Sequence, residues 1–186
     1  MAANFTFRKK ACGTLSGSIG VYILCDLDNI PVYVGQSKDG IRQRVQRHLT
    51  SARSDVIANR QIDVWEIAFV WEYPVAEKSD LDQLEAILFH HFNSKSRLMN
   101  GTNPLKPNPV LPIPEPAKMV QVMTNEEIAD RIKTELRLPR QASHYAQIVA
   151  HFVAVKNSDQ IAQAMDAHFE RLAKYHAMML ASSSAE

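Results

Sequence analysis

Hydrophobic positions in the first half of the chain follow first a strand period and then a helix period. Residues 20–25 and 30–35 are rich in β-branched and aromatic side chains, and turn-forming residues separate them, which predicts a hairpin. From Ile41 the apolar residues recur every fourth position, as on one face of a helix. Residues 63–73 alternate strictly between two faces and predict a third strand.

A second helix is predicted after Pro74. Ser79, with Asp82 three residues later, has the form of an N-terminal capping pair, and the helical pattern continues to about Phe92. On a helical wheel, Glu85 falls in the middle of an apolar stripe formed by Leu81, Leu84, Leu88 and Phe92.

Proline interrupts the chain after these elements. Six of the nine prolines lie within residues 104–116, a density that neither a helix nor a sheet ladder tolerates, so we expect an extended, semi-rigid segment. The remaining sequence predicts helices. Thr124 with Glu127 begins a helix that we expect to stop before Pro139, Ser143 begins another that continues to Val155, and Ser158 begins a third. The apolar stripe of this last helix comprises Ile161, Met165, Phe169, Leu172 and Met179.

These patterns predict an α+β fold with three parts. Residues 1–103 form a small three-stranded antiparallel sheet flanked by helices, residues 104–118 form a Pro-rich linker, and residues 119–186 form an all-α region of about three helices.

Composition narrows the class of protein. With 46% hydrophobic and 22% charged residues, the chain resembles an average globular protein and can form a real core. It has no apolar run of the ~18 residues that a membrane-spanning helix needs, and the basic residues 8–10 precede no apolar segment. We therefore expect a cytoplasmic protein without a membrane partner. Cys12 and Cys25 are too few for a disulfide framework, and we expect reduced thiols.

The net charge of +1 hides an uneven distribution. Residues 1–60 contain nine Lys and Arg against four Asp and Glu, whereas residues 61–100 contain three against seven, and the remainder is balanced. Such a basic surplus suits a phosphate-facing surface, although a solvated helix face would look the same. Its members are Lys38, Arg42, Arg44, Arg47, Arg53 and Arg60.

The order of several motif residues resembles the GIY-YIG nuclease family over about residues 19–103. The tripeptide at residues 20–22 is Gly-Val-Tyr, and after ten intervening residues Tyr-Val-Gly follows at residues 33–35. Downstream come Lys38 with Asp39, an Arg and a His on the next helix, then Glu85 and Asn100. The resemblance implies the compact sheet-and-helix catalytic unit of that family.

The sequence departs from the family pattern in two places. Val replaces Ile in both tripeptides, and an extra Gly40 precedes the helix, so that either Arg42 or Arg44 can be the family arginine. We choose Arg44, because His48 then lies one turn later on the same face, where the two side chains can grip a phosphate together.

Glu85 is the candidate metal ligand. An unpaired charge on an apolar stripe is costly, so this carboxylate should be paired, protonated or bound to a cation. An ion pair with a nearby arginine is the plain structural alternative. The family resemblance instead implies one Mg²⁺ or Mn²⁺ ion per active site, held by Glu85.

The other candidates also have ordinary structural interpretations. His48 shares its face with apolar residues and could be a core histidine, Tyr22 and Tyr33 could be packed strand aromatics, and Asn100 could be a turn residue. The resemblance implies catalytic roles for these four residues together with Arg44 and Glu85. The general base can be either Tyr22 or Tyr33, and the sequence does not decide between them. We choose Tyr22 as the base assisted by His48, with Tyr33 and Asn100 positioning the phosphate and water. We expect DNA contacts at Gly35, Lys38, Arg42 and Arg47.

The sequence therefore predicts a metal-dependent DNA endonuclease. Two alternatives stay open: a non-catalytic DNA-binding or regulatory module of the same fold, and a helical interaction protein that carries a nuclease unit. For the C-terminal helices we favour homodimerisation or partner binding over direct DNA contact. A helix-turn-helix made of residues 125–138 and 143–155, joined by a proline turn, is a further alternative.

Overall fold

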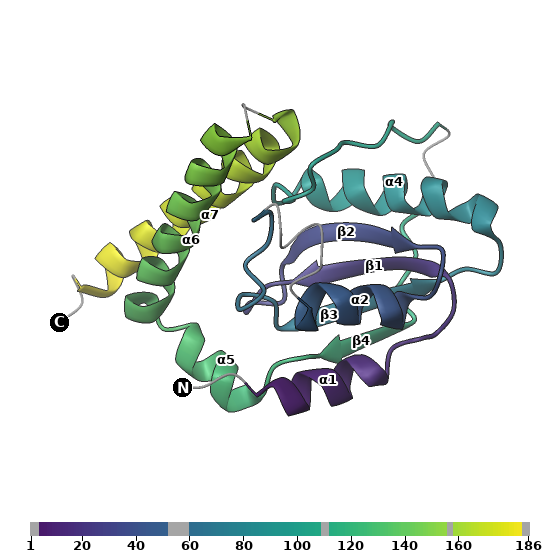
Figure 1. Ribbon diagram of the computed structural model, residues 1–186, viewed down its shortest axis with the longest axis horizontal. Helices are drawn as coiled ribbons and strands as arrows, with labels where there is room; N and C mark the ends of the chain where they lie inside the picture. Colours follow the sequence, from purple (N-terminus) through teal and green to yellow (C-terminus); the bar gives the residue numbers. More distant parts are fainter. Residues whose placement is uncertain (1–3, 52–59, 109–111, 156–157, 184–186) are drawn as a thin grey trace.

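The computed structural model describes residues 4–51, 60–108, 112–155 and 158–183. A four-stranded antiparallel sheet lies between two helical layers (Figure 1), which confirms the α+β class but gives one strand more than predicted. The strand order is β2-β1-β3-β4, and the strands are β1 (Gly20–Cys25), β2 (Pro31–Ser37), β3 (Phe69–Pro74) and β4 (Lys118–Gln121).

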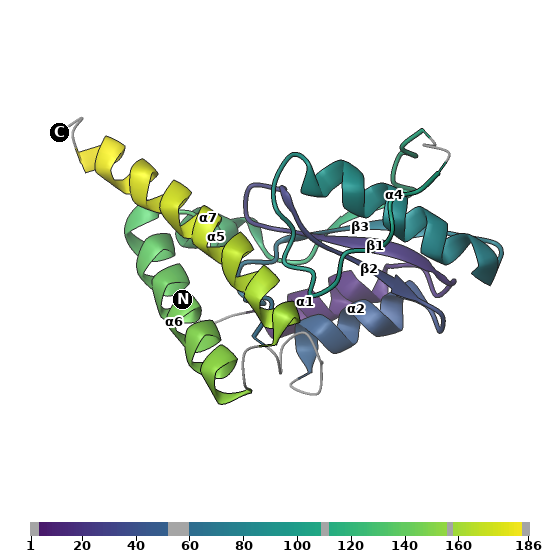
Figure 2. The ribbon, with the colours of Figure 1, turned by 90° about the horizontal axis from the view of Figure 1, so that it is seen from above.

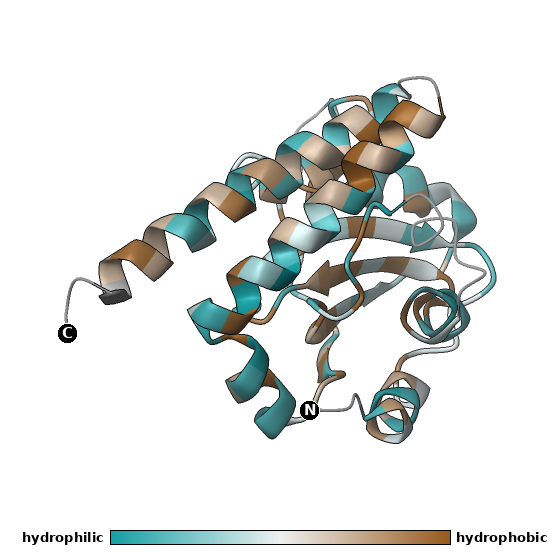
Figure 3. Ribbon diagram, turned by 60° about the vertical axis from the view of Figure 1, so that its left-hand side comes forward, coloured by the Kyte–Doolittle hydropathy of each residue, from teal (hydrophilic) through white to brown (hydrophobic). Residues whose placement is uncertain are grey.

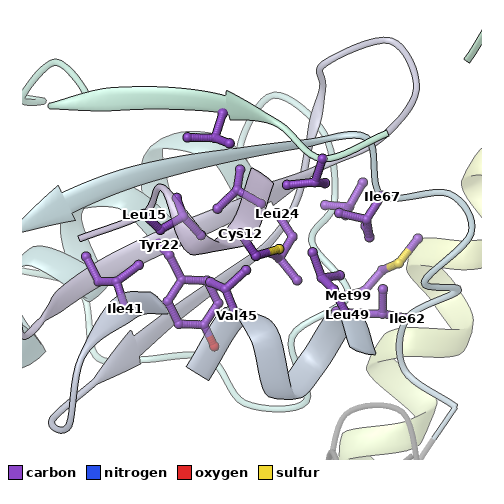
Figure 4. Close-up of a cluster of buried hydrophobic side chains, with 14 of the residues drawn as sticks. Cys12, Leu15, Tyr22, Leu24, Ile41, Val45, Leu49, Ile62, Ile67 and Met99 are labelled. Carbon is purple, nitrogen blue, oxygen red and sulfur yellow. The ribbon is translucent and has the colours of Figure 1, made fainter. Parts of the chain in front are cut away.

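Strand β1 is buried on both faces and separates the two halves of the core. Tyr22 and Leu24 pack on one side with residues of α1 (Phe5–Gly13) and α2 (Ile41–Thr50), as Figure 4 shows. Val21 and Ile23 pack on the other side against α4 (Leu81–Asn93). Figure 2 shows α4 on the face of the sheet opposite to α1 and α2. The side-chain alternation of β1 thus assigns Tyr22 to the α2 side.

The fourth strand was missed because it is short and follows the prolines. The described residues of 104–116 contain neither helix nor strand, as predicted. The backbone N–H of Ala117 then donates to the carbonyl of Glu72 at 2.9 Å, and β4 pairs with β3 from Phe69 opposite Gln121 to Glu72 opposite Lys118. The segment predicted as a linker therefore leads the chain back to the sheet.

Two predicted boundaries before α4 are wrong. Strand β3 begins at Phe69, not at residue 63, because Asp63 folds the preceding chain: its carboxylate accepts from the N–H of Trp65 and its carbonyl from that of Glu66, both at 3.0 Å. Ser79 does not cap α4. It lies in a 3₁₀ turn, η1 (Lys78–Asp80), and its hydroxyl contacts Asp80 at 3.4 Å.

The C-terminal region forms three helices, α5 (Asn125–Arg131), α6 (Thr134–Ala154) and α7 (Asp159–Ser183). The predicted capping box of Thr124 and Glu127 is present. Pro139, however, lies inside α6. Its missing N–H removes a single bond near the start of a long helix, so the chain turns at residues 132–133 instead. The helix-turn-helix built on a proline turn is therefore wrong.

Buried charges attach α6 and α7 to the rest of the molecule. Arg137 of α6 is 1% exposed; its Nε donates to Glu66 at 2.6 Å and its Nη1 to Asp28 at 2.7 Å. Arg171 of α7 donates to the fully buried Asp26 at 2.6 Å. Asp26 and Asp28 belong to the turn that joins β1 to β2, so the C-terminal helices hold the hairpin at its turn.

This interface explains why the predicted apolar stripe of α7 is only partly buried. Phe169 is 57% exposed, whereas Arg171 and Tyr175 are buried, because the surface that α7 meets is acidic. Figure 3 shows hydrophilic and hydrophobic residues interleaved along both long helices. Among the residues described, no helix has the length and hydropathy required to span a bilayer.

Candidate active site

The hairpin brings the two predicted tyrosines to one face of the sheet. Tyr22 pairs with Gly35 and Leu24 with Tyr33 in the antiparallel register, so both phenol rings lie on the α2 side. The Tyr22 hydroxyl is 2.7 Å from Nε2 of His48. The ring of Tyr33 has its centroid 6.3 Å from that of Tyr22 and 6.1 Å from that of His48. The three aromatic residues therefore form one cluster.

Gly35 makes this cluster possible. A Cβ at this position would lie 2.6 Å from the Tyr22 hydroxyl and 2.7 Å from Cε1 of Tyr33, closer than side chains approach one another. We predicted Gly35 as a DNA-binding residue. The structure gives it a steric reason to be glycine, which is to leave room for the two phenols.

Helix α2 starts where the extra glycine stands. Gly40 has φ +117°, and a Cβ there would lie 2.6 Å from the carbonyl of Gly17. The first N–H groups of a helix have no partner within the helix. Here the N–H of Ile41 donates to the carbonyl of Ser18 at 3.0 Å and that of Arg42 to the carbonyl of Ser16 at 2.9 Å, both in the loop that contains Gly17. This start places Ile41, Val45 and His48 in the core.

The two candidate arginines have different surroundings. Arg42 donates from Nε to the carbonyl of Leu15 at 2.8 Å, which ties it to the loop after α1. Arg44 lines an open pocket of about 360 Å³ at the end of β2. The pocket contains three cations and one acid, and its lining residues are Gln36, Ser37, Lys38, Asp39, Gln43, Arg44 and Arg47. Such a surplus of positive charge suits a phosphate group.

Two members of the basic surplus do not line this pocket. Arg60 donates to the side chain of Gln147 on α6 at 2.9 Å. Arg53 lies outside the described residues.

Glu85 lies beside this pocket on α4. Its Oε2 accepts from Nε2 of Gln36 at 2.9 Å. Burial raises the pKa of this carboxyl group, nearby Asp82 raises it further, and the Gln36 hydrogen bond and the charge of Lys38 lower it. The alternative of an ion pair with an arginine is not realised among the described residues, where the hydrogen-bond partner of Glu85 is a neutral amide.

The donors around Glu85 fit a hard divalent cation. Within the described parts of the chain, no group of three or more His, Cys, Asp or Glu side chains could hold a metal. Mg²⁺ nevertheless needs only one or two carboxylates, because water and substrate phosphate complete its coordination. Glu85 and Asp82 supply two carboxylates, and Gln36 has a buried Oε1 without a hydrogen-bond partner in the described structure.

Asn100 contacts the backbone of β2, and its role in positioning phosphate and water stays a prediction. Its Oδ1 accepts from the N–H of Val34 at 3.1 Å, and its Nδ2 donates to the carbonyl of Val34 at 2.6 Å. Both polar groups of this buried amide contact the backbone of β2. Asn100 therefore fixes the edge strand β2 at Val34, the residue between Tyr33 and Gly35.

The predicted site residues surround strand β2. Tyr22, Tyr33 and His48 lie on its α2 side, Glu85 approaches from α4, and the basic pocket lies at its end. Sequence reasoning missed Gln36 and Asp82. A signal was present for both, because Gln36 directly follows the second tripeptide and Asp82 precedes Glu85 by almost one helical turn.

Comparison with known proteins agrees with this arrangement. Residues 18–100 match the model of the GIY-YIG catalytic domain. A comparison with curated proteins finds no match. The matched segment, somewhat less than half of the chain, contains both tripeptides, Glu85 and Asn100, and its likeness to the GIY-YIG catalytic domain agrees with the resemblance seen in the sequence.

Proposed function

We propose that this protein is a metal-dependent DNA endonuclease that hydrolyses phosphodiester bonds at one site around β2. The observation that carries the proposal is the 2.7 Å hydrogen bond between the Tyr22 hydroxyl and His48. A phenol is a base near neutral pH only if a neighbour takes its proton, and His48 is that neighbour.

Substrate binding is assigned to the basic pocket. Lys38, Arg44 and Arg47 surround a space of about 360 Å³ at the end of β2. In this proposal their charges hold the DNA backbone, and Arg44 grips the phosphate that reacts, because a guanidinium can bond two of its oxygens in fixed geometry. Arg42 contributes at the edge of this surface.

The chemical step is hydrolysis. Tyr22, with its proton held by His48, removes a proton from a water molecule, and Tyr33 keeps that water in place. The water oxygen forms a bond to phosphorus and the bond from phosphorus to the 3′ oxygen breaks, which gives a 5′-phosphate and a 3′-hydroxyl. A Mg²⁺ or Mn²⁺ ion bound at Glu85 would supply positive charge to the phosphate and the leaving oxygen.

Assembly and location are further parts of the proposal. A unit with one site cuts both strands either as two protomers or by two successive nicks, and we assign homodimerisation to the C-terminal helices. Two further points stay predictions. One is the cytoplasmic location, and the other is the division of the chain into residues 1–103, 104–118 and 119–186, with the helices as a separate domain.

A plasmid cleavage assay tests the proposal. We expect the wild-type protein to nick or cut supercoiled DNA in the presence of Mg²⁺, and we expect Glu85→Gln to remove this activity while circular dichroism and the unfolding temperature stay unchanged. Glu77→Gln is the matched control, because Glu77 is an exposed carboxylate just before α4. Intact plasmid with every divalent metal tried would favour the non-catalytic DNA-binding alternative.

A further inference from the structure

One amide nitrogen joins two carboxylates on α4. Nε2 of Gln36 lies 2.8 Å from Oδ1 of Asp82 and 2.9 Å from Oε2 of Glu85. The two acids are three residues apart and therefore project from the same side of the helix. Two like charges that face one another are unfavourable unless a positive group lies between them, and here the two N–H groups of a neutral amide occupy that place.

The other half of the same amide is unsatisfied. Oε1 of Gln36 is buried and has no hydrogen-bond partner in the described structure. A buried acceptor without a partner is unfavourable, because it has lost its hydrogen bonds to water. The terminal torsion of glutamine is soft and roughly two-fold, so the amide can turn over, but two carboxylates would repel its oxygen unless a cation lay between them.

We propose that Asp82 binds the divalent cation together with Glu85, and that the Gln36 amide fills the cation position in the metal-free protein and turns its oxygen to the ion on binding. This inference rests on the proposed function and extends it from one ligand to three oxygen ligands. Carboxylate and amide oxygens are the donors that Mg²⁺ and Mn²⁺ prefer. Because Gln36 also lines the basic pocket, the ion lies where a bound phosphate can reach it.

Titration of the full-length protein with Mn²⁺ alone, followed by electron paramagnetic resonance without DNA, tests the inference. We expect one bound ion per chain in the wild type. Asp82→Asn is expected to weaken the affinity by about ten-fold to a hundred-fold, the range seen when partners of a metal site are removed. Asp80→Asn, an exposed acid just before the helix, is the matched control and keeps the wild-type affinity.

Gln36→Glu gives a second, independent readout. A third carboxylate increases repulsion in the metal-free protein and attraction for a cation. We therefore expect a lower unfolding temperature than wild type in the presence of a chelator and a larger rise on addition of Mn²⁺. Equal shifts in the variant and the wild type would overturn the role of Gln36.

The remaining outcomes separate this inference from the proposed function. If Asp82→Asn binds Mn²⁺ as tightly as the wild type while Glu85→Gln loses the ion, Asp82 is no ligand and the inference fails, but the nuclease proposal stands. If both variants keep wild-type affinity, the metal is not bound at Glu85 and both proposals fail.

Discussion

The Tyr22 hydroxyl has a neighbour that can hold its proton. His48 is 2.7 Å away, and both side chains are buried, so the pair is shielded from bulk water. Tyr33 is only partly buried and lies beside them. Within the proposed mechanism, this difference favours Tyr22 for proton transfer and Tyr33 for positioning.

The assignment predicts unequal effects of two matched substitutions. Tyr22→Phe removes the base and should lower kcat for DNA cleavage by about 10²-fold to 10⁴-fold, the range of general-base catalysis, with KM little changed. Tyr33→Phe should mainly raise KM. Tyr145→Phe on α6 serves as a control for the loss of a phenol. A larger loss of kcat in Tyr33→Phe than in Tyr22→Phe would reverse the roles of the two residues.

At the scale of elements, the hydrophobic pattern and the turn residues of the sequence predict the strands and helices that carry the motifs. The hairpin follows from the β-branched and aromatic residues at 20–25 and 30–35 and the turn residues between them, and α2 and α4 follow from the helical spacing after Ile41 and Leu81. Strand β4 could not be predicted this way, because a segment of four residues after the prolines is too short to show an alternation of hydrophobic and polar positions. Helix α1 has a weak amphipathic pattern and was not predicted.

Contacts between distant residues explain the remaining differences. The buried face of α7 is set by Asp26 and Glu66, which are more than one hundred residues from Arg171 and Tyr175 in the chain. In the site, the motif residues were predicted through the family resemblance, but the pairing of Gln36 with Asp82 and Glu85 depends on how β2 lies against α4. The backbone role of Asn100 also depends on that packing.

The glycine at the start of α2, the helix that carries Arg44 and His48, should be needed for the stability of the fold. Gly40→Ala places a Cβ 2.6 Å from the Gly17 carbonyl at φ +117°, and we expect a loss of about 1–3 kcal/mol in the free energy of unfolding. Gly13→Ala is the control, because a Cβ there meets nothing within 4 Å. Urea unfolding measures both. Equal stability of the two variants would show that α2 does not need a glycine at its start.

At the scale of the whole molecule, buried charges join the C-terminal helices to the hairpin of β1 and β2. Arg137 contacts Asp28 and Glu66, and its guanidinium lies 4.0 Å from the centre of the Tyr175 ring. A buried ion pair adds little net stability when complete, but removal of one partner leaves a buried charge. The hairpin therefore depends on α6 and α7 for its stability.

Arg137→Met tests this dependence. We expect a loss of about 3–5 kcal/mol in the free energy of unfolding, because Glu66 and Asp28 lose the buried Arg137 cation, and Arg140 remains beside Glu66 alone. The control is Arg97→Met: Arg97 pairs at 3.1 Å with both Asp166 and Glu170 on the surface, where such pairs contribute about 0–1 kcal/mol. Denaturant unfolding of both variants measures the difference. Similar losses would contradict the central role of the buried network.

His168 gives the interface a pH dependence. Burial, with a smaller effect of His144, lowers its pKa to about 3, and its Nε2 lies 3.0 Å from the carbonyl of Gln61. The unfolded chain binds a proton at this residue near pH ~6.5, whereas the folded chain does not. Stability should therefore fall as the pH drops below ~6.5, by up to about 1.4 kcal/mol per pH unit from this group.

His168→Gln removes this titration and keeps a donor for the Gln61 carbonyl. We expect the free energy of unfolding of the variant to fall less steeply than that of the wild type between pH ~6.5 and ~4.5. Urea unfolding at several pH values measures both slopes. Parallel curves would mean that His168 is protonated to the same extent in both states.

The most direct test of the whole account is to map the DNA ends that the protein produces. Wild-type protein with Mg²⁺ should convert a defined plasmid to nicked or linear products with 5′-phosphate and 3′-hydroxyl ends, and Glu85→Gln of equal stability should leave it supercoiled. Intact DNA with the wild type, ends of the opposite polarity, or undiminished cleavage by Glu85→Gln would contradict the assigned site.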